Sequence, residues 1–224
     1  MTLLDAGVDT FTIRLVLERS EAEHQQTGRE KLIEIHGPAD ITAETTDAIV
    51  NAANSSLLGG GGVDGAIHRT GGPAILAECR QIVARIRTLP AGKAVITSGG
   101  RLAAKHVIHT VGPIYRGGGR GEAETLASCH RESLRLADEH GLASLAFPAI
   151  STGAYGYPGT EAAPIAISAT IEALASAKHV ILCRFVLFDV STVRAYERAA
   201  EQLHRTIATS PIHSFPFRIE KAHS

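Results

Sequence analysis

This chain of 224 residues has few aromatic residues and no excess of positive over negative charge. There is no tryptophan, and only six phenylalanines and four tyrosines occur. An aromatic cage, or a platform on which several bases stack, is therefore not expected, because each needs clustered rings. The 22 Lys and Arg residues are balanced by 23 Asp and Glu, which gives a formal net charge of −1. General coating of nucleic acid requires a field of basic side chains, so the composition disfavours nucleic acid as a partner and leaves only a local basic patch open.

Cysteine and long apolar runs are scarce as well. The three cysteines are far apart and show no CxxC spacing, so we expect no disulfides and a reducing compartment. The cysteines and the eleven histidines lack the spacing of metal ligands, and no metal is expected. No run of eighteen apolar residues occurs, and Met1 is not followed by a basic stretch and an apolar segment. We therefore expect a cytoplasmic protein that does not contact membranes.

Short apolar strands alternate with amphipathic helices along most of the chain. Residues 11–17 and 32–35 have strand patterns and predict a hairpin with a long loop. Further strands are expected at 48–50, 94–97, 106–111, 145–150 and 180–188. The last of these is the longest apolar run and should be a buried central strand. Helices are expected from about residue 63, at 73–87, 122–140 and 161–177, and from a cap at Ser191 to about 205.

This alternation predicts a three-layer α/β/α fold with a central mixed sheet. The hydrophobic content of 44% is sufficient for one sizeable core, and we place a single domain at residues 30–205. Residues 1–29 are interpreted as an N-terminal extension that adds a strand to the sheet. Residues 206–224 hold two prolines and little periodicity, and are interpreted as a C-terminal tail.

The glycine-rich segment at residues 59–65, GGGGVDG, formally matches the GxGxxG fingerprint of a dinucleotide-binding Rossmann site. That motif has to lie directly between a strand and a helix, with an acidic residue about twenty positions on, at the end of the next strand. Here residues 51–56 intervene, and the nearest acidic candidate, Glu78, lies in a predicted helix. The Rossmann interpretation fails on this context. No Gly-Lys-Ser/Thr follows, so a nucleotide-triphosphatase loop is excluded too.

Two loops nevertheless have the composition of a phosphate site. Four consecutive glycines let backbone N–H groups approach a ligand closely, and a helix that starts near Val63 would add its partial positive charge. Residues 151–158, STGAYGYP, follow an apolar strand, and ligands of open α/β sheets bind beyond the carboxyl ends of strands. A flexible linker and an ordinary Gly/Pro turn are the alternative interpretations of the two loops.

Five blocks of the sequence, taken together, resemble the macrodomain family. They are DIT at 40–42, NAAN at 51–54, GGGGVDGAIH at 59–68, VIHTVGP at 107–113 and FPAISTGAYGYP at 147–158. The form of the glycine block is most similar to the MacroD-type branch, and the resemblance extends over about residues 30–205. It implies a three-layer macrodomain, ADP-ribose as the ligand, and a role in removing ADP-ribose from modified acceptors without a cofactor.

The resemblance also implies roles for individual residues. Asp40 would accept a hydrogen bond from the adenine amino group, and its alternative role is that of a turn or cap residue. Phe188 would flank the adenine, and its alternative position is in the core. Asn54 would hold the hydroxyls of the distal ribose, Tyr155 would pack on that ribose, and Asp64 would act in hydrolysis. The remaining ligand-binding positions implied by the resemblance are Ile41, Ala53, Gly60, Gly61, Gly62, Val63, Ser151, Thr152, Gly153, Ala154 and Gly156.

The function expected from this resemblance is removal of mono-ADP-ribose from acidic side chains of modified proteins, with Asp64 orienting or deprotonating a water and Asn54 fixing the sugar. Deacetylation of O-acetyl-ADP-ribose is a second activity that the pocket supports. A non-catalytic ADP-ribose reader and a hydrolase of ADP-ribosylated nucleic acid are the alternatives. His68 and His109 could serve as bases, but their predicted helix and buried strand favour structural roles. We expect a monomer.

The sequence departs from the family pattern at several places. Ala39 replaces the usual Gly before the aspartate, and Ala154 replaces the usual Ile or Val of the second loop, so the lid over the diphosphate should close less tightly. Residues 102–104 read LAA where LPA is common, and residues 116–121 have no assigned counterpart.

Overall fold

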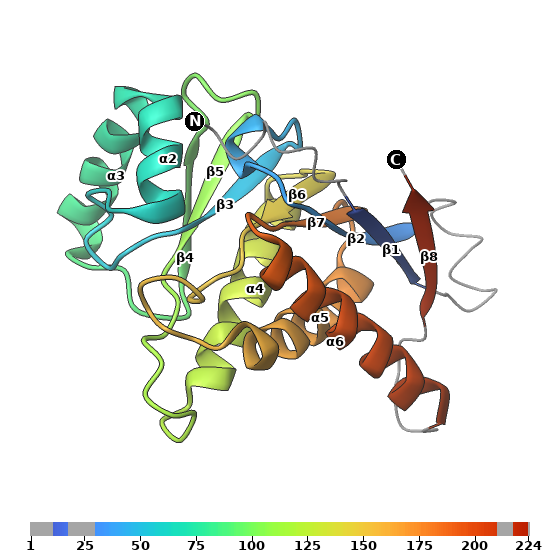
Figure 1. The fold of residues 1–224 in the computed structure, drawn as a ribbon. Coiled ribbons are helices and arrows are strands. Elements are labelled where there is room, and N and C mark those ends of the chain that lie inside the picture. Colours follow the sequence, from blue (N-terminus) through green and yellow to red (C-terminus); the bar gives the residue numbers. More distant parts are fainter. Residues whose placement is uncertain (1–10, 18–29, 210–216, 224) are drawn as a thin grey trace.

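The computed structural model describes residues 11–17, 30–209 and 217–223, and within them one mixed sheet of eight strands organises the chain (Figure 1). The strand order is β4-β5-β3-β6-β7-β2-β1-β8. The strands are β1 (Phe11–Leu17), β2 (Lys31–Gly37), β3 (Ala48–Ala52), β4 (Ala94–Ser98), β5 (His106–Thr110), β6 (Ser144–Phe147), β7 (Leu182–Val186) and β8 (Phe217–His223).

The five central strands, β5, β3, β6, β7 and β2, are parallel, whereas β4, β1 and β8 pair antiparallel at the two sides. The carboxyl ends of the central strands therefore meet at one edge of the sheet, where ligands of α/β proteins bind. The antiparallel pairing of β1 with β2 agrees with the predicted hairpin, and its connection lies outside the described residues.

Helices cover both faces of this sheet, which confirms the predicted three-layer α/β/α fold. In Figure 1, α2 and α3 lie beside β3, β4 and β5, and α4, α5 and α6 lie on the other face. Successive side chains of a strand point to opposite faces of the sheet, so each face has its own hydrophobic core. Ile49 packs in the core under α2 and α3, and Val50 packs in the core under α4, α5 and α6. The helices are α2 (Gly62–Gly71), α3 (Pro73–Ile86), α4 (Glu122–Glu139), α5 (Gly159–Ser176) and α6 (Val190–Thr209), with a short 3-10 helix, η2 (Ile41–Ala43).

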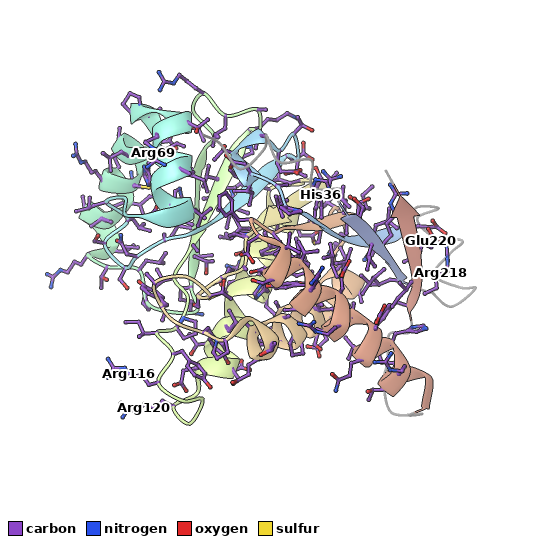
Figure 2. The ribbon with its side chains drawn as sticks, in the orientation of Figure 1. His36, Arg69, Arg116, Arg120, Arg218 and Glu220 are labelled. Atoms are coloured by element: carbon purple, nitrogen blue, oxygen red, sulfur yellow. The ribbon has the colours of Figure 1, made fainter. Side chains whose placement is uncertain are left out.

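The C-terminal segment differs from the predicted tail. α6 continues to Thr209, and β8 pairs antiparallel with β1 along its length. Figure 2 shows Arg218 and Glu220 on β8, and Arg218 Nε donates to Glu220 Oε1 at 3.0 Å. These polar residues alternate with Phe217 and Ile219, which is the pattern of a strand, so the prediction of a tail with little periodicity is wrong for residues 217–223. The placement of domain boundaries at residues 30 and 205 stays a prediction.

Three further boundaries also differ. The strand expected at 145–150 ends at Phe147, because Pro148 has no N–H for the ladder. The strand expected at 180–188 is shorter, Leu182–Val186, although it is central as predicted. The cap of α6 is Asp189 rather than Ser191: its Oδ1 accepts from the Thr192 N–H at 2.9 Å, and the Ser191 hydroxyl donates to the same carboxylate.

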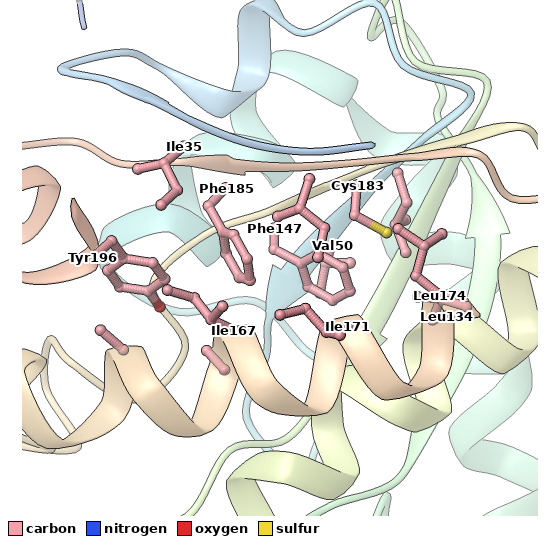
Figure 3. Packing of buried hydrophobic residues seen from close by; sticks show 14 of the residues in the cluster. Ile35, Val50, Leu134, Phe147, Ile167, Ile171, Leu174, Cys183, Phe185 and Tyr196 are labelled. Atoms are coloured by element: carbon pink, nitrogen blue, oxygen red, sulfur yellow. The ribbon is translucent and has the colours of Figure 1, made fainter. Parts of the chain in front are cut away.

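The larger core lies under α4, α5 and α6. Figure 3 shows Phe147 and Phe185 above Ile167 and Ile171 of α5, with Tyr196 of α6 beside them. Phe147 and Phe185 are partners in the β6–β7 register, and their ring centroids are 5.7 Å apart. This packing holds the central parallel strands in a fixed register, so the loops that leave their carboxyl ends start from rigid positions. In the described part of the chain, no helix has both the length and the apolar character needed to cross a membrane.

A buried lysine joins the start of β2 to the end of α5. Lys31 is 4% exposed, and its Nζ donates to the carbonyls of Leu174, Ala175 and Ala177 at 2.7, 2.8 and 2.6 Å. These carbonyls belong to the C-terminal turn of the helix, where a cation also interacts favourably with the helix dipole.

We expect Lys31→Met to lower the free energy of unfolding by about 2–4 kcal/mol, because it leaves several buried carbonyls without a donor. Urea unfolding followed by circular dichroism measures this change. Lys105→Met is the matched control: the Lys105 side chain is 75% exposed, its ion pair with Asp47 is at the surface, and its loss should cost less than about 1 kcal/mol. Equal effects of the two substitutions would contradict the role assigned to Lys31.

Candidate functional site

A pocket of about 380 Å³ opens at the carboxyl edge of the central strands. Its walls come from the segments that follow β3, β5 and β6. The volume lies in the range typical of small-molecule sites. The lining residues are Ala52, Ala53, Asn54, Gly60, Gly61, Gly62, Val63, Asp64, Gly112, Ala149, Ser151, Gly153, Ala154 and Tyr155.

Most of the residues predicted from the sequence therefore lie together around one cavity. Five predicted residues do not line it, namely Asp40, Ile41, Thr152, Gly156 and Phe188. Three lining residues were missed, namely Ala52, Gly112 and Ala149. Gly112 is the last residue but one of the VIHTVGP block, just after the strand at 106–110, and the carboxyl end of that strand was the available signal for it.

The first wall is the glycine loop at the start of α2. Gly61 is the N-cap of this helix and no side chain caps it, so the first N–H groups of α2 are free of side-chain acceptors. They face a pocket lined by Gly60, Gly61, Gly62 and Val63. Free N–H groups and the positive end of the helix dipole together favour an anion, and the helix start predicted near Val63 is confirmed.

Asn54 fixes the shape of this loop. Its Nδ2 donates to the carbonyl of Gly59 at 2.9 Å, and its Oδ1 accepts from the N–H and the hydroxyl of Ser56 at 3.0 and 2.6 Å. A Cβ on Gly60 would lie 3.4 Å from Asn54 Nδ2 and 3.0 Å from Asp64 Oδ2. The flexible-linker interpretation is therefore wrong, because Asn54 holds Gly59, Gly60 packs against Asn54 and Asp64, and Gly61 and Gly62 cap and begin α2.

The second wall is the loop that follows β6, and Ser151 is its most unusual residue. Its φ is +67°, a left-handed backbone conformation that residues other than glycine rarely adopt. Its hydroxyl is buried and meets no hydrogen-bond partner among the described residues. A Cβ on Gly112 would lie 2.1 Å from this hydroxyl, so the close approach requires glycine there. Ser151 also lines the pocket, and a strained residue with an unpaired hydroxyl at the wall of a pocket is a candidate to bind a ligand oxygen.

Behind the first wall, a buried hydrogen-bond network holds Asp64, which is 5% exposed. Asn51 Nδ2 donates to Asp64 Oδ1 at 2.7 Å and lies 3.1 Å from His109 Nδ1. Because Nδ2 is a donor, His109 Nδ1 has to accept, and the proton of this imidazole is on Nε2, 2.9 Å from the Thr97 hydroxyl. Burial is the main cause that lowers the pKa of His109 to about 3, with His68 contributing further, so this imidazole is neutral at pH 7.

Three possible metal ligands meet next to this network, although the sequence spacing gave no sign of them. The ligand atoms of His68, Cys79 and His109 lie within 4.8 Å of one another. Their chemistry fits a metal poorly: His109 Nε2 carries a proton, and burial raises the pKa of the Cys79 thiol to about 11. His68 Nε2 lies 3.4 Å from Asp64 Oδ1, next to the carboxylate that Asn51 holds. We interpret the group as support for Asp64.

The predicted adenine-binding residues lie outside the cavity but next to each other. Ala39 N donates to Leu187 O at 2.9 Å, which places the neighbours Asp40 and Phe188 on adjacent segments. Asp40 Oδ1 accepts from the N–H and the hydroxyl of Thr42, both at 2.9 Å, so the cap role is real and the other carboxylate oxygen is not engaged in it. Phe188 is 66% exposed, so its interpretation as a core residue is wrong.

Taken together, the sheet edge and its two loops define an α/β domain with a pocket built for a phosphate-bearing ligand. The Macro domain family model matches residues 50–166. A Macro domain-containing protein of Cupriavidus necator is 55% identical over 167 residues, 75% of this chain and 95% of the relative. The O-acetyl-ADP-ribose deacetylase of Klebsiella pneumoniae is 54% identical over 159 residues, 71% of this chain and 91% of that protein.

Solved structures of macrodomains are also similar to this chain. The Oceanobacillus iheyensis macrodomain with ADP is 40% identical and superposes with a TM-score of 0.76 over 87% of this chain and 98% of that one. The Trypanosoma brucei macrodomain in complex with ADP-ribose is 39% identical, with a TM-score of 0.67 over 75% and 68% of the two chains. The chain therefore belongs to the macrodomain family, in its MacroD-type branch.

The pH dependence of stability tests the buried network behind Asp64. His109 titrates at about 3 in the folded state against 6.5 for an ordinary histidine. Below pH 6.5 the unfolded chain takes up a proton that the folded chain refuses, so the stability due to neutral His109 is complete above pH 6.5 and is lost as the pH falls toward 3. We expect wild type to lose about 1.4 kcal/mol more per pH unit than His109→Gln in this window. Urea unfolding at pH 6.5, 5.5 and 4.5 measures both slopes, and parallel slopes would show that His109 is not buried as a neutral group.

Proposed function

We propose that this chain is an ADP-ribose-binding hydrolase that removes mono-ADP-ribose from acidic side chains of modified proteins and deacetylates O-acetyl-ADP-ribose. The observation that carries the proposal is the pair Asn54 and Asp64, which lies at the glycine wall of the pocket, with Asp64 held in the buried network. The two substrates share a chemistry, since each joins a carboxylic acid to the distal ribose as an ester. One water-activating carboxylate serves both.

The two walls support the binding part of this proposal. In it, the diphosphate lies between the N-terminus of α2 and the loop that follows β6, where the unpaired Ser151 hydroxyl and free backbone N–H groups meet it. The adenine lies between Asp40 and Phe188, and the free oxygen of Asp40 accepts from its amino group in a charge-assisted bond. The distal ribose then reaches Asn54 and Tyr155 at the far end of the cavity.

The two oxygens of Asp64 have separate tasks in this mechanism. Oδ1 accepts from Asn51 and anchors the side chain, whereas Oδ2 faces Gly60 on the pocket side. Oδ2 is therefore the atom that accepts a hydrogen bond from the attacking water. The water oxygen forms a bond to the carbon that it attacks, and the ester C–O bond at that carbon breaks. The proton that the water loses passes to Asp64 or to a neighbouring diphosphate oxygen and from there to the departing oxygen. Like-charge repulsion from the diphosphate makes Asp64 the better base.

The comparisons favour a hydrolase over a reader, because several relatives at 52–54% identity carry the name O-acetyl-ADP-ribose deacetylase. A reader needs the same binding walls but no carboxylate aimed at the reacting end. Tight binding of ADP-ribose together with no release from either ester substrate would identify a reader.

We expect Asp64→Asn to lower kcat by at least about 100-fold on glutamate-linked mono-ADP-ribosyl protein and on O-acetyl-ADP-ribose, because general-base catalysis is worth that much. Asn54→Ala should lower kcat as well and weaken ADP-ribose binding, since Asn54 also shapes the glycine loop. Calorimetric titration with ADP-ribose separates binding from turnover. Asp138→Asn is the control, because this carboxylate binds the backbone of residues 178–180. Full turnover by Asp64→Asn would rule out Asp64 as the group that activates the water.

A further inference from the structure

Large hydrophobic side chains are exposed on several loops at the carboxyl edge of the sheet. In the described part of the chain, three of the four such residues follow strands at the carboxyl edge of the sheet. They are Leu58 at 53% exposure, Ile114 at 54% and Phe188 at 66%, and the fourth is Ile86 on α3 at 42%. Single exposed hydrophobic residues are ordinary, so the position and the anchoring of each one decide whether it has a role. Phe188 belongs to the proposed adenine site, which leaves Leu58 and Ile114 without a function.

Leu58 is presented by a rigid turn next to the reacting end of the pocket. Leu57, the residue before it, is 1% exposed, has a φ of +54°, and donates its N–H to the Asn54 carbonyl at 3.1 Å. Gly59, the residue after it, accepts from Asn54 Nδ2. With both neighbours hydrogen-bonded to Asn54, Leu58 is held outward between two pocket-lining segments, the one that ends at Asn54 and the one that starts at Gly60.

Ile114 has a similar position on the opposite wall. Gly112, two residues earlier, lines the pocket, and Tyr115, the next residue, donates its N–H to the Tyr155 carbonyl at 2.9 Å. The Tyr115 hydroxyl donates to Glu161 at 2.8 Å, and its ring packs 4.6 Å from that of Tyr157. The segment is thus fastened to the loop that carries Tyr155, and Ile114 is its solvent-facing side chain.

We propose that Leu58 and Ile114 form an apolar rim that binds the polypeptide bearing the ADP-ribosylated side chain. The inference rests on the proposed function and specifies its acceptor. Beyond the ester, O-acetyl-ADP-ribose ends in a methyl group, whereas a modified protein continues as a chain that has to leave the pocket between the Asn54 and Tyr155 walls. Apolar groups on anchored loops at that exit gain contact area only with the larger substrate.

Charge on the neighbouring loop does not offer a better explanation. Arg116 and Arg120 project from the loop before α4 (Figure 2). Glu122 lies beside them, and its carboxylate accepts from the backbone N–H groups of both arginine residues. Two arginines next to a carboxylate, in a chain with a formal net charge of −1, do not make the strong basic field that a phosphate-rich acceptor such as nucleic acid requires.

The double variant Leu58→Ser/Ile114→Ser tests the rim. We expect kcat/KM on glutamate-linked mono-ADP-ribosyl protein to fall about tenfold, as loss of two partly buried aliphatic contacts predicts. Deacetylation of O-acetyl-ADP-ribose and the Kd of ADP-ribose should stay within about twofold of wild type. Ile86→Ser, which removes an exposed isoleucine from α3, is the matched control and should change none of the three values.

Binding measured without turnover separates failure of the rim from failure of the proposed function. In an Asp64→Asn background, the rim variant should bind the modified protein about tenfold more weakly and bind ADP-ribose as before. If wild type releases ADP-ribose from no substrate, the hydrolase proposal fails while this binding comparison still tests the rim. Equal losses with both ligands, no loss with the modified protein, or a loss confined to ADP-ribosylated nucleic acid would each overturn the rim proposal.

Discussion

The hydrogen bond from Asn51 to Asp64 connects the core of the sheet to the pocket, and the arrangement of the site depends on it. A carboxylate that is 5% exposed needs a donor, because a buried charge without one is strongly destabilising. The donor is the side chain of a central strand, and that side chain is oriented in turn by His109 of the neighbouring strand. The position of the proposed water-activating oxygen is therefore set by the parallel register of β3 and β5, which pairs these two residues directly.

Binding and chemistry are divided between backbone and side chains in this pocket. In the proposed binding mode, the two walls approach the diphosphate through N–H groups, and glycines make such a close approach possible. Glycine is also required where the walls pack, since a Cβ on Gly112 would lie 2.1 Å from the Ser151 hydroxyl. In the same proposal, side chains enter at the two ends, where the adenine and the distal ribose are distinguished from other groups.

The sequence predicted best those features that depend on a single strand end or on one short motif. The two glycine-bearing loops that line the pocket and the helix start near Val63 could be predicted because glycines and a helix N-terminus act within a few residues. The Asn51–His109–Thr97 network could not, since its members come from three strands and depend on register rather than on spacing. The same reason explains β8, whose partner β1 lies about two hundred residues earlier. Phe188 was ambiguous because the apolar run continues past Val186, where the strand ends and the chain turns outward.

The position of Asp64 has a consequence for the choice between a reader and a hydrolase. A carboxylate next to a diphosphate repels it, and this repulsion lowers affinity for the very ligand that the walls are built to hold. A protein that only binds ADP-ribose would gain affinity from an uncharged residue at this place. Here the chain instead stabilises the charge with a buried network of Asn51, His109 and Thr97, and leaves Oδ2 turned toward Gly60. If the diphosphate binds as proposed, that arrangement weakens ground-state binding and stabilises the transition state for attack of water, which is the condition for catalysis.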